Sequence, residues 1–135
     1  MVAVEIVYEG TLRCKALHEP SGASFVTDAP RDNHGKGESF SPTDLMATAL
    51  GSCILTVMGL AANTLGVNLQ GAHVRVEKTM QTTPVRRIIR LAATVNVPMK
   101  LDEKTRAALQ HAAEHCPVHK SLHPDIDAPI IFHWA

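Results

Sequence analysis

The chain lacks an excess of charge of either sign. Its 13 lysines and arginines balance 13 aspartates and glutamates over 135 residues, so the formal net charge is zero. A nucleic-acid partner normally requires a basic face, so this balance argues against nucleic-acid binding. Zero net charge also favours association, which suggests that some surface is buried in an oligomer. The length suits one domain over residues 1–135, with enough chain to bury a core.

Cysteine is scarce as well, with only Cys14, Cys53 and Cys116 in the chain. An odd number at long spacings does not form the disulfide framework of a small secreted protein. Free or transiently oxidised thiols in a reducing compartment are the simpler interpretation. The first ten residues, "MVAVEIVYEG", show no basic segment and no cleavage site of a signal peptide. We therefore expect a cytoplasmic protein.

Two common catalytic motifs are missing. Ser52 lies in "LGSCILTVM" without the G-x-S-x-G pattern of a hydrolase. The segment "GKGESFSPTD" lacks the spacing of a phosphate-binding glycine loop. These absences leave the cysteines and their neighbours as the main candidates for chemistry.

Alternating apolar and polar residues predict strands in two groups. Val4, Ile6 and Tyr8 share one side of a first strand, expected to be half-buried, and "TLRCKALHE" and "GASFVTDAP" follow it with turns between them. Two longer strands are expected between His73 and Val97, and a last strand in "APIIFHWA". Strands grouped in runs with helices between them predict an α+β domain with antiparallel sheets.

The longest predicted helix begins at "SPTD", with Ser41 as N-cap and Asp44 in capping-box position, and runs to about Thr64. It carries no charge from Leu45 to Ala62, which is typical of a core helix or of a membrane span. No basic flank follows and strands surround it on both sides. We therefore expect no membrane and a central apolar helix covered by sheet and by a second helix.

The segment "EHCPVHKSL" contains the most reactive local pattern. If Pro117 begins a short helix, Cys116 is its N-cap, and the helix N-terminus together with His119 and Lys120 would lower the thiol pKa. The alternative is a small buried residue, which is common for free cysteine. Local sequence leaves both interpretations open.

Two further interpretations concern neighbouring residues. Cys53 lies mid-helix among apolar residues, and its local context favours a structural core cysteine. His111, His115, Cys116 and His119 could form a zinc site, but no second pair of ligands stands elsewhere in the chain.

"SPTDLMATALGSCILTVM" and "HCPVHKSL" together resemble the OsmC-like superfamily, which includes the organic hydroperoxide resistance proteins. The resemblance covers nearly the whole chain. "DAPRDNHGKGESFSPTDL", "VEKTM" and "RRIIRL" resemble its general OsmC-like branch. It implies a single OsmC-like α+β domain in an intertwined homodimer, with antiparallel sheets wrapped around the central apolar helix.

The resemblance also implies roles for the cysteines. Cys53 matches the peroxidatic nucleophile of the family, and Cys116 matches the resolving thiol that forms a disulfide with it. The implied reaction is reduction of organic hydroperoxides, with an external dithiol as reductant and no metal or organic cofactor.

The residues that support the thiolate depart from the family pattern. Thr43 stands where the family has a glutamate, with Asp44 adjacent to it. The supporting arginine is expected to be Arg31, with Arg13 as the alternative. Two other functions remain beside the peroxidase: an OsmC-like redox sensor or binder of small apolar ligands, and a His/Cys metal protein.

Overall fold

The computed structural model describes residues 1–135, and its contacts group into two units, Met1–Met46 and Ala47–Ala135. We call these the first unit and the second unit. Each is described by itself. The interpretation of residues 1–135 as one domain stays a prediction.

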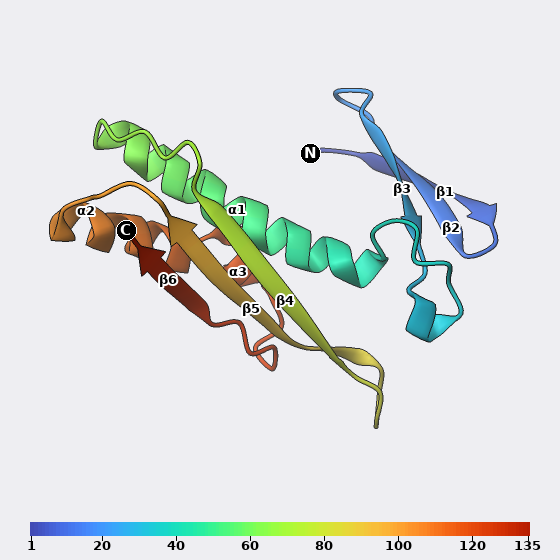
Figure 1. The fold of residues 1–135 in the computed structure, drawn as a ribbon. Coiled ribbons are helices and arrows are strands. Elements are labelled where there is room, and N and C mark those ends of the chain that lie inside the picture. The colour runs from blue at the N-terminus through green and yellow to red at the C-terminus, as the bar shows by residue number, and fades with distance from the viewer. The chain divides into compact units, whose positions relative to one another are not determined.

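The first unit contains an antiparallel sheet in the order β1-β2-β3 (Figure 1). The strands are β1 (Val4–Gly10), β2 (Arg13–His18) and β3 (Ser24–Asp28), which confirms the predicted meander. A short 3-10 turn, Arg31–Asn33, lies in the loop that follows β3.

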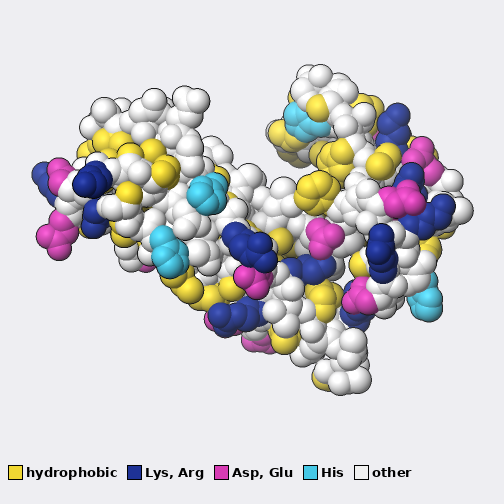
Figure 2. Space-filling view, viewed as in Figure 1, with side chains coloured by type: hydrophobic (Ala, Val, Ile, Leu, Met, Phe, Trp, Pro, Cys, Tyr) yellow, Lys and Arg dark blue, Asp and Glu magenta, His cyan; other side chains and the backbone are white.

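The expected burial of β1 is wrong for this chain. Val4, Ile6 and Tyr8 are 51%, 59% and 63% exposed, and apolar side chains are visible at the surface of this sheet in Figure 2. A period-two pattern shows which side chains share a face, but it does not show that anything covers that face.

Helix α1 (Pro42–Thr64) has the predicted bounds. The backbone N–H of Ser41 donates to the Asp44 carboxylate at 2.9 Å, and the backbone N–H of Asp44 donates to the Ser41 hydroxyl at 3.1 Å. This reciprocal pair is the predicted capping box. Gly66 follows the helix with φ +70°, a left-handed conformation that glycine adopts without strain.

The second unit contains a mixed sheet in the order β4-β5-β6, where we had expected antiparallel strands only. β4 (His73–Gln81) and β5 (Arg87–Val97) are antiparallel, but β5 and β6 (Ile130–Trp134) are parallel. The connection between the parallel strands contains α2 (Glu103–Glu114) and α3 (Pro117–Ser121), and such a helical crossover returns the chain in its original direction. Alternation along a strand carries no information about its direction.

The three helices lie behind this sheet in the view of Figure 1. Alternate residues of β5 are buried toward them: Leu91, Ala93, Val95 and Val97. They join a core with residues of α1 and α2, and α1 comes close to β4 because Gly51 has no side chain. A Cβ atom at Gly51 would lie 3.1 Å from the side chains of Val74 and Val76.

Helix α1 is buried along one stripe only. The stripe consists of Leu50, Gly51, Ile54, Met58 and Ala62. Thr48, Ser52, Thr56 and Leu60 lie on the exposed side. By length and composition alone, α1 could also cross a membrane, since its mean hydropathy is 1.9. A core helix passes the same test.

Candidate active site

Cys116 is fixed at the beginning of α3, as the sequence predicts. It is the N-cap of the helix, Pro117 occupies the first helical position, and the backbone N–H of His119 donates to Cys116 Sγ at 3.2 Å. The thiol is fully buried, at 0% exposure, within the core of the second unit.

Cys53 approaches the same place from α1. It is partly exposed and packs against the core cluster that contains Cys116. The two thiols lie close enough for Cys53 to influence the titration of Cys116, and neither is in a disulfide. The structure thus brings together two cysteines that are 63 positions apart in the sequence and unequal in their access to solvent.

Burial decides the electrostatics of Cys116. Desolvation raises the pKa of this thiol above its ordinary value, and the hydrogen bond from the His119 backbone opposes the rise without cancelling it. Contact with Cys53 raises the pKa further. Of the two interpretations that local sequence left open, the burial of Cys116 favours the small buried residue, because the sequence shows the helix N-terminus but not the surrounding core.

Three proposed supporting residues belong to the first unit, whereas the cysteines belong to the second. Asp44 is engaged in the capping box with Ser41. The Thr43 hydroxyl lies 3.2 Å from the Ser41 hydroxyl. Arg31 donates from Nε to the backbone carbonyl of Lys36 at 3.1 Å. The structure brings Thr43 and Asp44 together around Ser41 and gives Arg31 a separate partner.

The first unit also contains a charge cluster that sequence reasoning missed. Arg13 donates two hydrogen bonds to the Asp28 carboxylate, at 3.1 and 3.0 Å, and a third to Glu38 at 3.0 Å. Asp28 is only 2% exposed, and its bond to Arg13 holds the carboxyl pKa below the usual value. Arg13 and Asp28 face each other across β2 and β3. A correct register of the predicted hairpin would have paired them.

The histidines near Cys116 do not gather into the zinc pattern considered above. His111 and His115 are both exposed, and their rings form a tilted contact with centroids 4.2 Å apart. The ring of His119 instead bonds the backbone carbonyl of Ala128, at 2.9 Å from Nε2. No group of three or more His, Cys, Asp or Glu side chains is placed to hold a metal ion.

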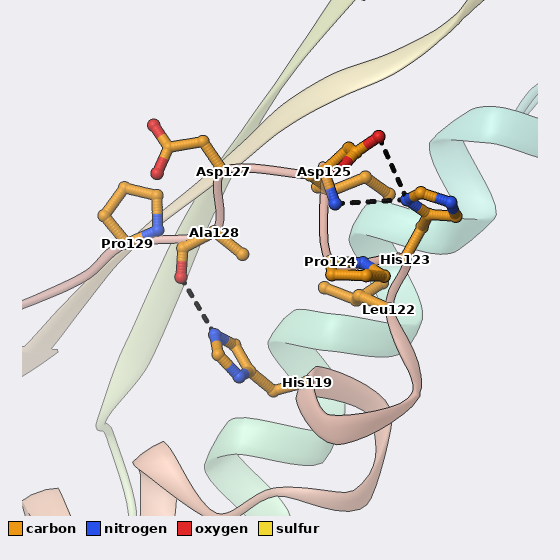
Figure 3. Close-up of a pocket in the computed structure, with 9 residues that line it drawn as sticks. His119, Leu122, His123, Pro124, Asp125, Asp127, Ala128 and Pro129 are labelled. Carbon is orange, nitrogen blue, oxygen red and sulfur yellow. Dashed lines mark hydrogen bonds and ion pairs between the residues drawn. The ribbon is translucent and has the colours of Figure 1, made fainter.

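A hollow of about 520 Å³ opens beside α3 (Figure 3). Its walls are His119 and the loop from Leu122 to Pro129. Two aspartates on this loop pair with β5: Asp125 with Arg87 at 3.7 Å, and Asp127 with Arg90. The hollow therefore lies next to the segment that holds Cys116.

The comparisons with known proteins agree with this architecture. Residues 35–129 match the family model described as OsmC-like protein. That match covers more than half of the chain, so the chain belongs to the OsmC-like protein family. A comparison with curated protein sequences gives no match.

Solved structures give the same result. A protein of Psychrobacter arcticus 273-4, described as a proposed osmotic stress induced and detoxification response protein, is 42% identical, with 98% of this chain and 96% of that chain covered and a TM-score of 0.93. An organic hydroperoxide resistance protein OsmC of Legionella pneumophila is 16% identical over 98% and 96% of the two chains, with a TM-score of 0.78. An OsmC-like protein of Mycoplasma pneumoniae is 14% identical over 100% and 96%, with a TM-score of 0.80. The last two similarities concern the fold.

Proposed function

We propose that this protein is a thiol-dependent peroxidase that reduces organic hydroperoxides, with Cys53 as nucleophile and Cys116 as resolving thiol. The observation that carries the proposal is the unequal exposure of two thiols in contact. Cys53 is partly exposed and can meet a substrate, whereas Cys116 is fully buried beside it. Family membership supports the same assignment.

In the first step, the Cys53 thiolate attacks one oxygen of the peroxide. The O–O bond breaks, the alcohol leaves with a proton, and Cys53 becomes a sulfenic acid. In the second step, the sulfur of Cys116 attacks the sulfur of Cys53, and the hydroxyl group leaves as water with the Cys116 proton. An external dithiol then reduces the disulfide by supplying two electrons and two protons.

The raised pKa of Cys116 fits the second role better than the first. A thiol that keeps its proton is a poor nucleophile toward peroxide, because the thiolate is the reactive form. Once Cys53 is oxidised, the contact between the two sulfurs provides the high effective concentration that the second step needs.

We also propose that Arg31, Thr43 and Asp44 support the Cys53 thiolate. Of these, Asp44 is already bound in the capping box, so its carboxylate would have to serve both roles. Arg13 is held by Asp28 and Glu38, which leaves Arg31 as the preferred cation. Arg31→Ala should slow thiol oxidation by peroxide more than Lys36→Ala, which removes a neighbouring positive charge but leaves the Lys36 carbonyl in place.

The central experiment counts thiols after one equivalent of cumene hydroperoxide. The wild type should lose two thiols rapidly, and Cys53→Ser should lose none. Cys116→Ser should lose one, and dimedone should trap a sulfenic acid at Cys53. Cys14→Ser serves as the matched control and should behave like the wild type. A wild type that keeps all its thiols for many minutes would contradict the peroxidase proposal.

A second candidate function is binding of a small apolar ligand without peroxide reduction. A hollow of about 360 Å³ lies between α1 and β4, with apolar walls that include Leu55, Val74 and Val76. Gly51 lines this hollow and lies on the other flank of α1 from Cys53, since two helical positions differ by about 200°. Fatty-acid analogues that raise the melting temperature of a protein inert to peroxide would favour this function.

We further propose that the protein acts as a cytoplasmic homodimer, without a membrane partner. The exposed apolar residues of β1 and the exposed side of α1, where Leu60 is 64% exposed, need a cover in water. A second copy provides it without insertion of α1 into lipid. The polar residues Thr48, Ser52 and Thr56 on that side of α1 favour a protein cover over hydrocarbon.

Light scattering after gel filtration tests the dimer. Leu60→Glu should shift the protein toward monomers, because it would bury a charge in the contact. Val85→Glu is the control, since Val85 is similarly exposed, at 62%, but lies in the turn between β4 and β5. A wild type that is monomeric at all concentrations and soluble without detergent would overturn the dimer proposal.

A further inference from the structure

The segment that holds Cys116 packs on the core through few side chains, chiefly Val118 and Leu122, which are only partly buried. Helix α3 has five residues, and none of them is buried. The hollow beside it takes up space that side chains would otherwise fill (Figure 3). Specific bonds therefore add to this limited packing in setting the position of the buried thiol.

One residue makes two of these bonds. The backbone N–H of His119 donates to Cys116 Sγ at 3.2 Å, and its ring lies 2.9 Å from the carbonyl oxygen of Ala128. Figure 3 shows the ring pointing at this oxygen across the edge of the hollow. A carbonyl oxygen only accepts, so Nε2 carries the proton and donates it in both the neutral and the charged ring.

The acceptor is itself held by the sheet. On one side of Ala128, the carbonyl of Asp127 accepts from Leu91 N–H at 2.9 Å. On the other side, the carbonyl of Pro129 accepts from Ala93 N–H, also at 2.9 Å. Both donors belong to the buried strand β5. The Ala128 carbonyl is thus a rigid anchor rather than part of a freely moving loop.

We propose that His119 is a positioning residue that ties the Cys116 thiol to the sheet and thereby holds it against Cys53. Its ring fixes the first turn of α3 to β5 through Ala128, while its backbone fixes the sulfur. Cys53 is carried by α1, which packs on the same sheet through Gly51. Both sulfurs are therefore positioned relative to the same sheet. Neither of the two His119 bonds involves a residue of the first unit.

The expected consequence is thermodynamic. A thiol held near its partner has a higher effective concentration, so the tether favours the Cys53–Cys116 disulfide over the dithiol. This inference rests on the proposed function, because it assumes that the two cysteines form a disulfide. It goes beyond that function because it assigns to His119, which takes no part in the reaction itself, an effect on the stability of the Cys53–Cys116 disulfide.

The test compares two variants of His119. His119→Gln keeps an N–H donor at the same number of bonds from Cα, and His119→Leu keeps the volume without a donor. Both are made in a Cys14→Ser background and equilibrated in mixtures of reduced and oxidised dithiothreitol. The oxidised reagent takes two electrons and two protons from the cysteines when the disulfide forms.

His119→Leu should lower the equilibrium constant for the disulfide by about fivefold, which is the effect of one ordinary hydrogen bond. This change corresponds to a reduction potential about 20 mV higher. His119→Gln should have the same equilibrium constant for the disulfide as the parent protein, which carries Cys14→Ser alone. The tether is overturned if both variants match the parent, if both shift equally, or if the potential of His119→Leu falls.

A second measurement separates this inference from the peroxidase proposal. In a Cys14→Ser/Cys53→Ser background, Cys116 is the only thiol, and its alkylation reports the opening of its buried site. His119→Leu should react about fivefold faster than His119→Gln, on the same hydrogen-bond energy. If this contrast holds while the wild type forms no disulfide, the tether stands and the peroxidase proposal fails. If peroxide oxidises the wild type but the two variants are alkylated at the same rate, the peroxidase proposal stands and the tether fails.

Discussion

The two sheets of this protein differ in what covers them. In the second unit, the residues of β5 that face the helices are buried, and Leu91, Ala93 and Val95 are each 0% exposed. In the first unit, the apolar residues of β1 remain more than half exposed. Both sheets show the same alternation in sequence. The difference teaches that alternation prepares a face for burial, but that helices or another chain must supply the cover.

The largest contrast is expected from removing a leucine from each sheet. Leu91→Ala should lower the free energy of unfolding by about 2–5 kcal/mol, because it leaves a cavity in the core. Leu17→Ala makes the same change on β2, where the side chain is 38% exposed, and should cost clearly less. Urea unfolding measures both.

Measuring the effects of Leu91→Ala and Leu17→Ala on the unfolding free energy at several protein concentrations sharpens the comparison. If a second copy covers the first sheet, the cost of Leu17→Ala should decrease as the protein is diluted toward monomers, whereas the cost of Leu91→Ala should stay the same. Equal and large costs at every concentration would contradict the view that the first sheet is uncovered in the single chain.

A hydroxyl group tests burial without a change of shape. Val95→Thr should destabilise by about 1–3 kcal/mol, because a hydroxyl is placed in an apolar core. Val4→Thr, at a residue that is 51% exposed in the single chain, should stay within about 0.5 kcal/mol when the protein is diluted to monomers. Thermal unfolding of the two variants gives the comparison. A similar loss at both positions would show that β1 is covered in solution.

The same contrast continues on the two sides of α1. Gly59→Ala should raise stability by about 0.5–1 kcal/mol, because alanine loses less backbone entropy in a helix and nothing lies within 4 Å of the new Cβ atom. Gly51→Ala should raise the stability less than Gly59→Ala does, or lower it, because its Cβ atom would press on the side chains of Val74 and Val76. Denaturation midpoints check the order. A Gly51→Ala variant more stable than Gly59→Ala would show that β4 moves away readily.

The smallest contrast needs no mutation and appears only in acid. The pKa of Asp28 is lowered, chiefly by its hydrogen bond with Arg13, so its contribution to stability is complete above a pH of about 4 and is lost as pH falls through the lower folded-state pKa. Asp102 in the second unit also has a lowered pKa, from its bonds to Thr105, but it is exposed at a helix N-cap.

Acid should therefore loosen the first sheet before the second. Amide signals from β1–β3 should weaken at a higher pH than those from β4–β6 in nuclear magnetic resonance spectra. Asp28→Asn is the control, because its side chain does not titrate and the difference between the sheets should no longer depend on pH in this range. Simultaneous loss of both sets of signals in the wild type would contradict the assignment to Asp28.

Much of the local structure could be predicted from the sequence, because it depends on neighbours along the chain. The capping box of Ser41 and Asp44 and the N-cap position of Cys116 rest on side chains bonding to backbone within three residues. The two strands expected between His73 and Val97 are present as β4 and β5.

The candidate site could be predicted only in part. A resemblance to a known family paired Cys53 with Cys116, and the structure places their thiols in contact. Local sequence alone could not decide whether Cys116 is an activated thiol or a buried residue, and only the surrounding core shows that it is buried. The bond between His119 and Ala128 had no sequence signal at all, because it depends on how the last loop returns to β5.

The sequence by itself determined the bounds of α1, which side chains share a face of a strand, and that Ser41 and Cys116 are helix N-caps. These follow from steric and hydrogen-bonding preferences that act over a few residues. Only the tertiary structure decided that β6 runs parallel to β5, that Arg13 binds Asp28, and that one thiol is buried while its partner is reachable. Strand direction, desolvation and the pairing of distant groups depend on the path of the whole chain, which no local preference encodes.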